Sequence, residues 1–305
     1  MDTENPNKIL TNLEDMAKKS GLDISEEIQK ISEKLQSGEP SSKIWEQVEL
    51  ARHSERPRTL DYIDMLVDDF VELHGDRCFG DDSAMIGGIG FIDGTAVTII
   101  GNQKGRNLRE TIARNGGMAH PEGYRKALRL AKQAEKFKRP IITFIDTQGA
   151  YPGLEAEERG IGEAIAVNLR EFSQLKTPII CIIIGEGGSG GALGIGVGDK
   201  IYMLENAIFS VISPEGCASI LLRDSSKAQD AAAMLKITGQ EVLEMKMING
   251  VISEPKGGAH TDPQKTAENI RTRITTDLRE LQKHRPEVLV RYRNKKIQSI
   301  GHYEE

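Results

Sequence analysis

The 305-residue sequence contains few cysteines and no long apolar run. Its three cysteines, Cys78, Cys181 and Cys217, are far apart and form no Cys-x-x-Cys pair. This spacing argues against a zinc ribbon within the chain and implies no disulfide framework. The longest apolar runs are too short to span a bilayer, and the polar residues 1–5 are unlike a signal peptide. These absences predict a cytoplasmic protein without a membrane segment.

The sequence also lacks an excess of positive charge and several motifs of known chemistry. It has 46 acidic and 40 basic residues, for a net charge of −6, which argues against a dedicated nucleic-acid binder. A phosphate-binding P-loop is absent, and no histidine stands at metal-ligand spacing from another ligand, so we expect no metal site in this chain. Ser189 lies among glycines but lacks a convincing set of nucleophile-elbow partners.

A glycine-rich stretch is the most informative feature that is present. Residues 178–184 form an apolar run rich in β-branched residues, which predicts a strand buried on both faces. Eight of the fourteen residues from Gly185 to Gly198 are glycine. Residues 185–192 predict a tight turn that opens a helix, and small residues continue down that helix to Gly198. Since the first amides of a helix are unpaired, Gly190 and Gly191 are candidates to hold an oxyanion. The same glycines are compatible with close packing of the helix.

A second segment repeats this pattern 38 residues upstream. Residues 140–146 match the run at 178–184 in apolar character, and residues 147–153 form another glycine-containing turn. Gly149 and Ala150 occupy the position in this turn that corresponds to the glycine pair. Two such turns in adjacent repeats predict an active site that stabilises negative charge in more than one place.

The order of apolar and helical patterns predicts an α/β domain with parallel strands. We expect a helical extension over residues 1–57, a core over 58–260 and a C-terminal helical segment over 261–305. Within the extension, residues Ile24 to Leu35 and Ile44 to His53 have helical spacing. After the extension, residues Leu60 to Leu73 predict a further helix. The core is predicted to contain strands at 86–91, 96–100, from 141, at 178–184, 200–203, 207–211 and 248–252, and helices at 122–137, 157–174 and from Ser213. A helix at 263–283 is predicted in the C-terminal segment.

Several charged residues are candidates for the chemistry. Glu186, between two turn glycines, is the best carboxylate for a general acid or base, and His120 is the next candidate. Asp146 is expected to cap the turn that follows it. A basic stretch consists of Lys104, Arg106, Arg109, Arg114, Arg125 and Arg129. We expect most of these side chains to lie on a solvated surface and a minority to contact phosphates or a carboxylate.

Four motifs together resemble the carboxyltransferase α subunits of bacterial acetyl-CoA carboxylase. They are residues 185–193 (GEGGSGGAL), 211–216 (VISPEG), 121–130 (PEGYRKALRL) and 149–153 (GAYPG). The resemblance covers roughly residues 40 to 260. It implies a crotonase-like fold, a spiral of ββα units that here carries the N-terminal helical extension.

This resemblance also implies an activity and its partners. The reaction would transfer a carboxyl group from carboxybiotin, carried on biotin carboxyl carrier protein, to acetyl-CoA, giving malonyl-CoA in the first committed step of fatty acid synthesis. The chain would act in an α2β2 heterotetramer whose β subunit carries the zinc, with biotin carboxylase in the wider complex. Gly190 and Gly191 would hold the biotin ureido oxygen, with Gly149 and Ala150 nearby. Gln148 stands where many members of the family have proline.

Three other functions remain open. One is a related biotin-dependent decarboxylase subunit that acts on a different acyl-CoA. A stand-alone crotonase-type hydratase or decarboxylase would use Glu186 or Glu163 as acid or base and would need neither biotin nor a partner. A non-catalytic scaffold subunit would only bind its partner.

Overall fold

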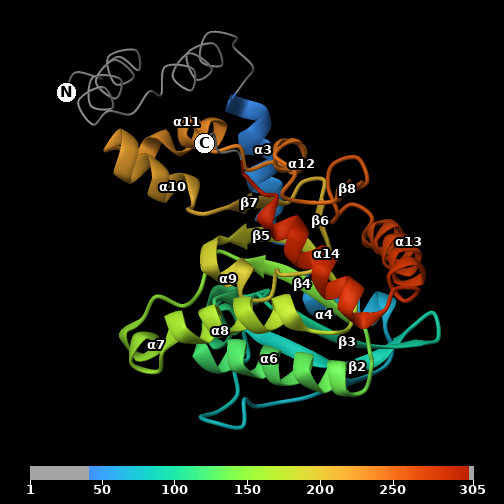
Figure 1. Cartoon of the computed structure of the whole chain (residues 1–305). Helices are drawn as coiled ribbons and strands as arrows, with labels where there is room; N and C mark the ends of the chain where they lie inside the picture. The colour runs from blue at the N-terminus through green and yellow to red at the C-terminus, as the bar shows by residue number, and fades with distance from the viewer. Residues whose placement is uncertain (1–40, 302–305) are drawn as a thin grey trace, which may run out of the picture.

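A computed structural model describes residues 41–301, and Figure 1 shows their arrangement. The predicted helix from Ile24 to Leu35 lies outside the described residues, as does most of the predicted extension. The helices are α3 (Ser41–Ala51), α4 (Thr59–Leu66), α5 (Leu108–Ala113), α6 (Pro121–Lys136), α7 (Leu154–Glu158), α8 (Ile161–Gln174), α9 (Ser189–Leu193), α10 (Pro214–Cys217), α11 (Ala228–Met234), α12 (Gly239–Glu244), α13 (Pro263–Leu281) and α14 (Pro286–Gln298). None of these helices is long and apolar enough to cross a membrane.

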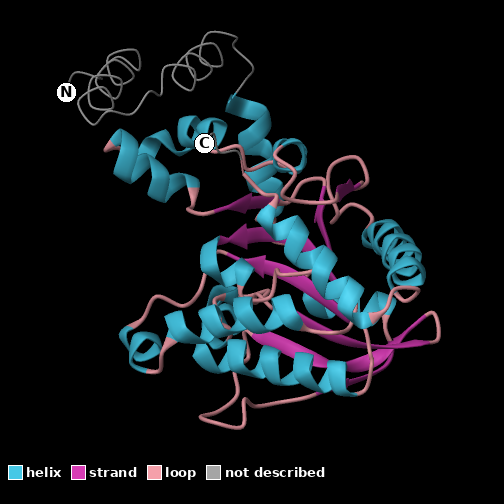
Figure 2. Cartoon of the chain, viewed as in Figure 1, coloured by secondary structure: helices cyan, strands magenta, loops and turns pink. Residues whose placement is uncertain are grey.

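Eight strands form one mixed sheet, drawn in magenta in Figure 2. The strands lie in the order β1-β2-β3-β4-β5-β6-β8, and β7 pairs with the far end of β5. The first two pairings are antiparallel and the others are parallel. Their bounds are β1 (Asp68–Glu72), β2 (Met85–Ile92), β3 (Thr95–Asn102), β4 (Ile141–Thr147), β5 (Ile179–Gly188), β6 (Lys200–Leu204), β7 (Ile208–Ser210) and β8 (Gly250–Ile252). The α/β class with a parallel sheet is confirmed.

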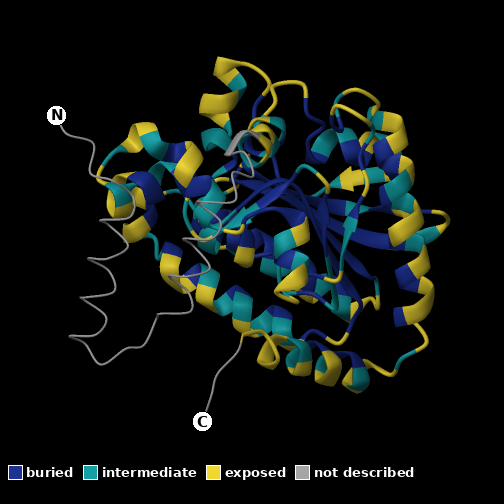
Figure 3. Cartoon of the chain, turned by 90° about the horizontal axis from the view of Figure 1, so that it is seen from above, coloured by how far each residue is buried: buried dark blue, intermediate teal, exposed yellow. Residues whose placement is uncertain are grey.

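The two apolar repeats form the centre of the core. Every residue of β4 is buried, and β5 is buried up to Gly187. The two strands pair in parallel with Ile141 opposite Ile179, so equivalent positions of the repeats lie side by side. Helices α6 and α8 pack together over one face of the sheet (Figure 1), and α4 contacts the opposite face. Buried residues, dark blue in Figure 3, are concentrated in the strands between these layers.

Several predicted elements are confirmed close to their expected ends. The hairpin of β2 and β3 turns at Asp93 and Gly94, both of which have positive φ. Pro121 is the first residue of α6, and the Ser213 hydroxyl accepts the Gly216 amide at the start of α10.

Two predicted helices are wrong in part. The helix predicted over Leu60–Leu73 ends at Leu66, because the next residues form edge strand β1 and pair with β2. Hydrogen bonds to β2 outweigh the helical spacing of these residues. The helix predicted over 157–174 is divided into α7 and α8 at Gly160, whose φ of +78° interrupts a right-handed helix.

The C-terminal helix α14 is attached to the core by one buried arginine. Arg293 is 1% exposed and forms a salt bridge with Asp199, with Nη2 2.8 Å from Oδ2. Its guanidinium also donates to the carbonyl oxygens of Phe172, Leu175 and Thr177. A buried charge with this many partners is stabilising only while all of them are present.

We therefore expect Arg293→Met to lower the free energy of unfolding by about 3–5 kcal/mol, because it leaves Asp199 buried without its charge partner. Urea unfolding followed by circular dichroism measures this difference. Arg291→Met, on the exposed face of the same helix, is the matched control and should change stability by about 0.5 kcal/mol or less. Equal losses for the two variants would contradict the anchoring role of Arg293.

Candidate active site

The glycine-rich stretch begins as a strand and turns later than predicted. Gly185 to Gly188 belong to β5, and the helix α9 starts at Ser189. The prediction of a turn from Gly185 is wrong because β7 pairs with Glu186–Gly188 and keeps them extended. The prediction that the helix continues to Gly198 is also wrong, since α9 ends at Leu193.

Gly190 and Gly191 are the second and third residues of α9. At these positions an amide has no acceptor within its own helix. Gly190 is half-buried and Gly191 is buried, so both amides lie at the end of the sheet rather than in open solvent. They have the properties that an oxyanion site requires, and their role as donors stays a prediction.

The first glycine turn follows β4 directly. The Thr147 hydroxyl accepts the Gly149 amide at 3.2 Å and donates to the Gly149 carbonyl oxygen at 2.7 Å. Thr147 thus closes the turn for which Asp146 was predicted as the cap. The Asp146 carboxylate instead accepts the Glu186 amide at 2.9 Å, on the neighbouring strand.

The two turns are in backbone contact with one another. A Cβ atom added to Gly191 would lie 2.3 Å from the Gly149 carbonyl carbon, and one added to Gly188 would lie 2.0 Å from the Gln148 oxygen. Glycine at these two positions permits the close approach. The structure therefore brings Gly190, Gly191, Gly149 and Ala150 together, as the repeat predicts.

A cluster of charged side chains lies just before both turns, and we call it the charged cluster. It consists of Asp146, Lys104, Glu186, Arg52 and Glu215. The Lys104 ammonium lies 2.7 Å from both Asp146 Oδ1 and Glu186 Oε2. Arg52 Nε donates to the other Glu186 oxygen at 2.8 Å, and its Nη1 lies 2.6 Å from Glu215 Oε1. Residues from the turn after α3, the loop after β3, β4, β5 and α10 therefore meet here.

These contacts keep Glu186 ionised. Burial by itself raises the pKa of the Glu186 carboxyl, but the charges of Lys104 and Arg52 and their hydrogen bonds outweigh it, so the pKa is lowered. Burial likewise lowers the pKa of the Lys104 ammonium, but Asp146 and Glu186 together raise it. A carboxylate with both oxygens engaged and a lowered pKa is poorly suited to take up a proton. The structure therefore argues against Glu186 as a general acid or base.

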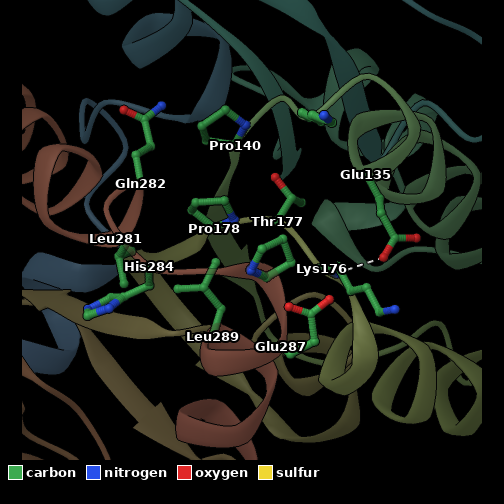
Figure 4. Close-up of a pocket in the computed structure, with 12 residues that line it drawn as sticks. Glu135, Pro140, Lys176, Thr177, Pro178, Leu281, Gln282, His284, Glu287 and Leu289 are labelled. Carbon is green, nitrogen blue, oxygen red and sulfur yellow. Dashed lines mark hydrogen bonds between the residues drawn. The ribbon is translucent and has the colours of Figure 1, made fainter.

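A cavity of about 290 Å³ lies beside α9. Gly190 lines it together with mainly apolar side chains, among them Leu193, Phe209, Met245 and Met247. It can accept a largely apolar ring next to the free amide of Gly190. We find no comparable glycine turn at a second cavity, of about 630 Å³, shown in Figure 4. There Pro140 and Pro178 precede β4 and β5, so it lies at the opposite end of these strands.

The other predicted candidates lie in different environments. His120 stacks on Tyr151, with 4.1 Å between the ring centroids, next to the first glycine turn. Glu163 is exposed in the first turn of α8. Of the basic stretch, Lys104 joins the charged cluster, whereas Arg125 pairs with Asp76 at 2.7 Å and Arg129 donates to the Gly75 carbonyl. No group of three or more potential metal ligands is found in residues 41–301.

The parts played by Arg52 and Glu215 could not be predicted from the sequence. Arg52 is separated from Glu186 by 134 residues, and Glu215 is separated from Arg52 by 163 residues. No local sequence pattern connects these residues. For Lys104 a weak signal existed, because it lies in a basic loop directly after a strand.

Comparison with known proteins connects this site to one family. A family model described as acetyl co-enzyme A carboxylase carboxyltransferase-like matches residues 2–301. A relative from Treponema denticola, named acetyl-coenzyme A carboxylase carboxyl transferase subunit alpha, is 76% identical over all of both chains. A protein of the same name from Alkaliphilus oremlandii is 55% identical over 93% of this chain and 92% of its own.

Solved structures show the same fold at low sequence identity. Transcarboxylase 12S, with methylmalonyl-coenzyme A and methylmalonic acid bound, superposes with a TM-score of 0.61 at 19% identity. The match covers 74% of this chain and 41% of the longer transcarboxylase chain. The expected crotonase-like fold is thereby confirmed.

The contact between the two turns leads to a prediction about methyl groups. Gly191→Ala would push a methyl into the Gly149 backbone, so we expect it to lower the free energy of unfolding by about 1–3 kcal/mol. Gly190→Ala is the matched control, because the nearest atom to its new methyl would be 3.6 Å away, on Ile165. Thermal unfolding compares the two, and a Gly191→Ala variant as stable as Gly190→Ala would refute the close contact.

Proposed function

Because the chain belongs to the family of acetyl-CoA carboxylase carboxyltransferase α subunits, we propose that its α9 turn is the biotin side of the carboxyl-transfer site. The reaction of this family moves a carboxyl group from carboxybiotin to acetyl-CoA and yields malonyl-CoA. The position of Gly190, in the first turn of α9 and at the wall of an apolar cavity, with Gly191 next to it, is the observation that carries the proposal.

The glycine amides act on charge that develops during transfer. Carboxybiotin, when bound, would supply the carboxyl group that is transferred. Gly190 and Gly191 would donate hydrogen bonds to its ureido oxygen and stabilise the negative charge that develops there. Gly149 and Ala150, in backbone contact with this turn, contribute nearby donors or support its position.

The cavity beside Gly190 accepts the fused rings of biotin. Leu193, Met245 and Met247 offer an apolar surface to the ring carbons, and methionine adapts to irregular shapes. The amides stand at the same wall, so one site meets both the apolar body and the polar oxygen of the ligand.

Proton transfer from acetyl-CoA does not require Glu186 in this proposal. The Glu186 carboxylate is held as an ion between Lys104 and Arg52. Biotin, when bound, would supply a basic nitrogen for the proton of the acetyl methyl group.

The chain works with other subunits. The name subunit alpha of its relatives implies a multi-subunit complex. We propose an α2β2 heterotetramer in which the β subunit binds the acyl-CoA and carries zinc, served by biotin carboxyl carrier protein and biotin carboxylase. Val211, which lines the α9 cavity, and Ile220 and Leu221 are large apolar residues exposed by 77%, 69% and 58%, which suits a surface covered by a partner. Residues 1–57 and 261–305 flank the core of residues 58–260 in this proposal.

Reconstitution tests the function directly. Malonyl-CoA and biocytin are mixed with the chain alone and with its β subunit, and release of acetyl-CoA is followed. Activity only in the mixture supports a shared site, and activity of the chain alone would overturn it. A stable complex that never transfers a carboxyl group would instead favour a scaffold.

Replacing Gly190 with proline tests the oxyanion role. Gly190→Pro removes one amide donor, and we expect kcat to fall about 100- to 1,000-fold. Gly190→Ala keeps the amide and has room for its methyl, so its loss should be far smaller. Circular dichroism and complex formation check that both variants fold. Near-normal turnover of a folded Gly190→Pro variant would rule out the donor role.

A further inference from the structure

We propose that Lys104 is a positioning residue, which sets the spacing between the two glycine turns by bridging Asp146 and Glu186. The inference rests on the proposed function, in which these turns hold the biotin oxygen. Lys104 itself touches no reacting atom in this proposal and acts through the two carboxylates.

The strand pairing is interrupted where Lys104 binds. Ile145 of β4 lies opposite Ile183, but two residues later Thr147 lies opposite Gly187, so β5 has two additional residues in this interval. Regular ladder hydrogen bonds between β4 and β5 are therefore lost just before both turns begin.

Side chains replace the missing ladder. Asp146 Oδ1 accepts the Glu186 amide at 2.9 Å, and Arg56 Nε donates to the Ile184 carbonyl at 2.7 Å. The Lys104 ammonium then joins the two strands at 2.7 Å from each carboxylate. Asp146 is one residue before the first turn, and Glu186 is two residues before Gly188. A shift of these strand ends moves the turn amides directly.

The negative charges of Asp146 and Glu186 make the Lys104 bridge essential to the positions of the two strand ends. The carboxylates of Asp146 and Glu186 are each only 6% exposed and share the single Lys104 cation. Without it, two buried anions would face one another and repel, unless one took up a proton. The other charges that act on the pair are Arg52 in the turn after α3, Glu215 on α10 and Arg58 before α4, and none of them bridges the two carboxylates.

Another buried lysine provides a matched control. Lys126 on α6 is 1% exposed, and its ammonium lies 2.5 Å from Asp81 Oδ1 and 2.8 Å from the Asp82 carbonyl oxygen. It holds the loop before β2 and does not contact either turn. Lys126→Met therefore removes a buried lysine of similar kind without touching the strand ends of β4 and β5.

The test uses the full chain assembled with its β subunit, with biocytin and malonyl-CoA as substrates. We expect Lys104→Met to lower kcat about 10- to 100-fold, because displacement of about 1 Å has such effects on reacting groups. The KM for malonyl-CoA should stay within about twofold, as expected for a defect confined to positioning. Lys126→Met should not lower kcat in this way.

A further readout separates positioning from general destabilisation. The double variant Lys104→Met/Glu186→Gln should recover part of kcat at neutral pH, since it removes the repulsion between the two carboxylates. Loss of stability alone would not produce this recovery.

Amide hydrogen exchange of the isolated chain tests the inference independently of activity. Lys104→Met should accelerate exchange in peptides covering both turns, residues 147–151 and 188–193, and Lys126→Met should not. Unchanged exchange in these peptides, or a kcat equal to that of Lys126→Met, would overturn the role of Lys104. An inactive wild-type complex would contradict the proposed function instead, and the exchange data would still decide the positioning role.

Discussion

The bridge from Lys104 to Asp146 and Glu186 is the interaction on which the candidate site depends. It holds the ends of β4 and β5 together where their backbone pairing is interrupted. Two buried carboxylates are stable in this place only because cations neutralise them. Arg52, in the turn after α3, extends the cluster to Glu215 on α10, so segments from distant parts of the sequence contribute to the position of the turns.

Glycine has a second, steric part in this arrangement. Gly188 and Gly191 lie so close to residues 147–150 that a side chain at either position would collide with the backbone. Gly190 has room for a methyl group and lines the α9 cavity. The glycines of this motif therefore have different roles. Gly188 and Gly191 allow the two turns to touch, and Gly190 leaves its amide accessible to a ligand.

Much of the fold could be predicted because its signals are local. The runs at 141–147 and 179–184 are apolar without alternation, which is typical of buried parallel strands, and Asp93-Gly94 is a hairpin turn. The predictions failed where tertiary contacts outweighed local pattern. Asp68 to Glu72 form a strand because β2 offers hydrogen bonds, and Gly185 to Gly188 stay extended because β7 pairs with them.

The sequence by itself determined the α/β class and the family, because both follow from contiguous sequence motifs. The same motifs predict the four turn residues Gly149, Ala150, Gly190 and Gly191. Only the tertiary structure decided the state of Glu186, which changed from a candidate acid or base to an ion held by Lys104 and Arg52. Its partners are 82 and 134 residues away in the sequence. These ion pairs form only when distant strands and helices pack together, so no local sequence pattern predicts them.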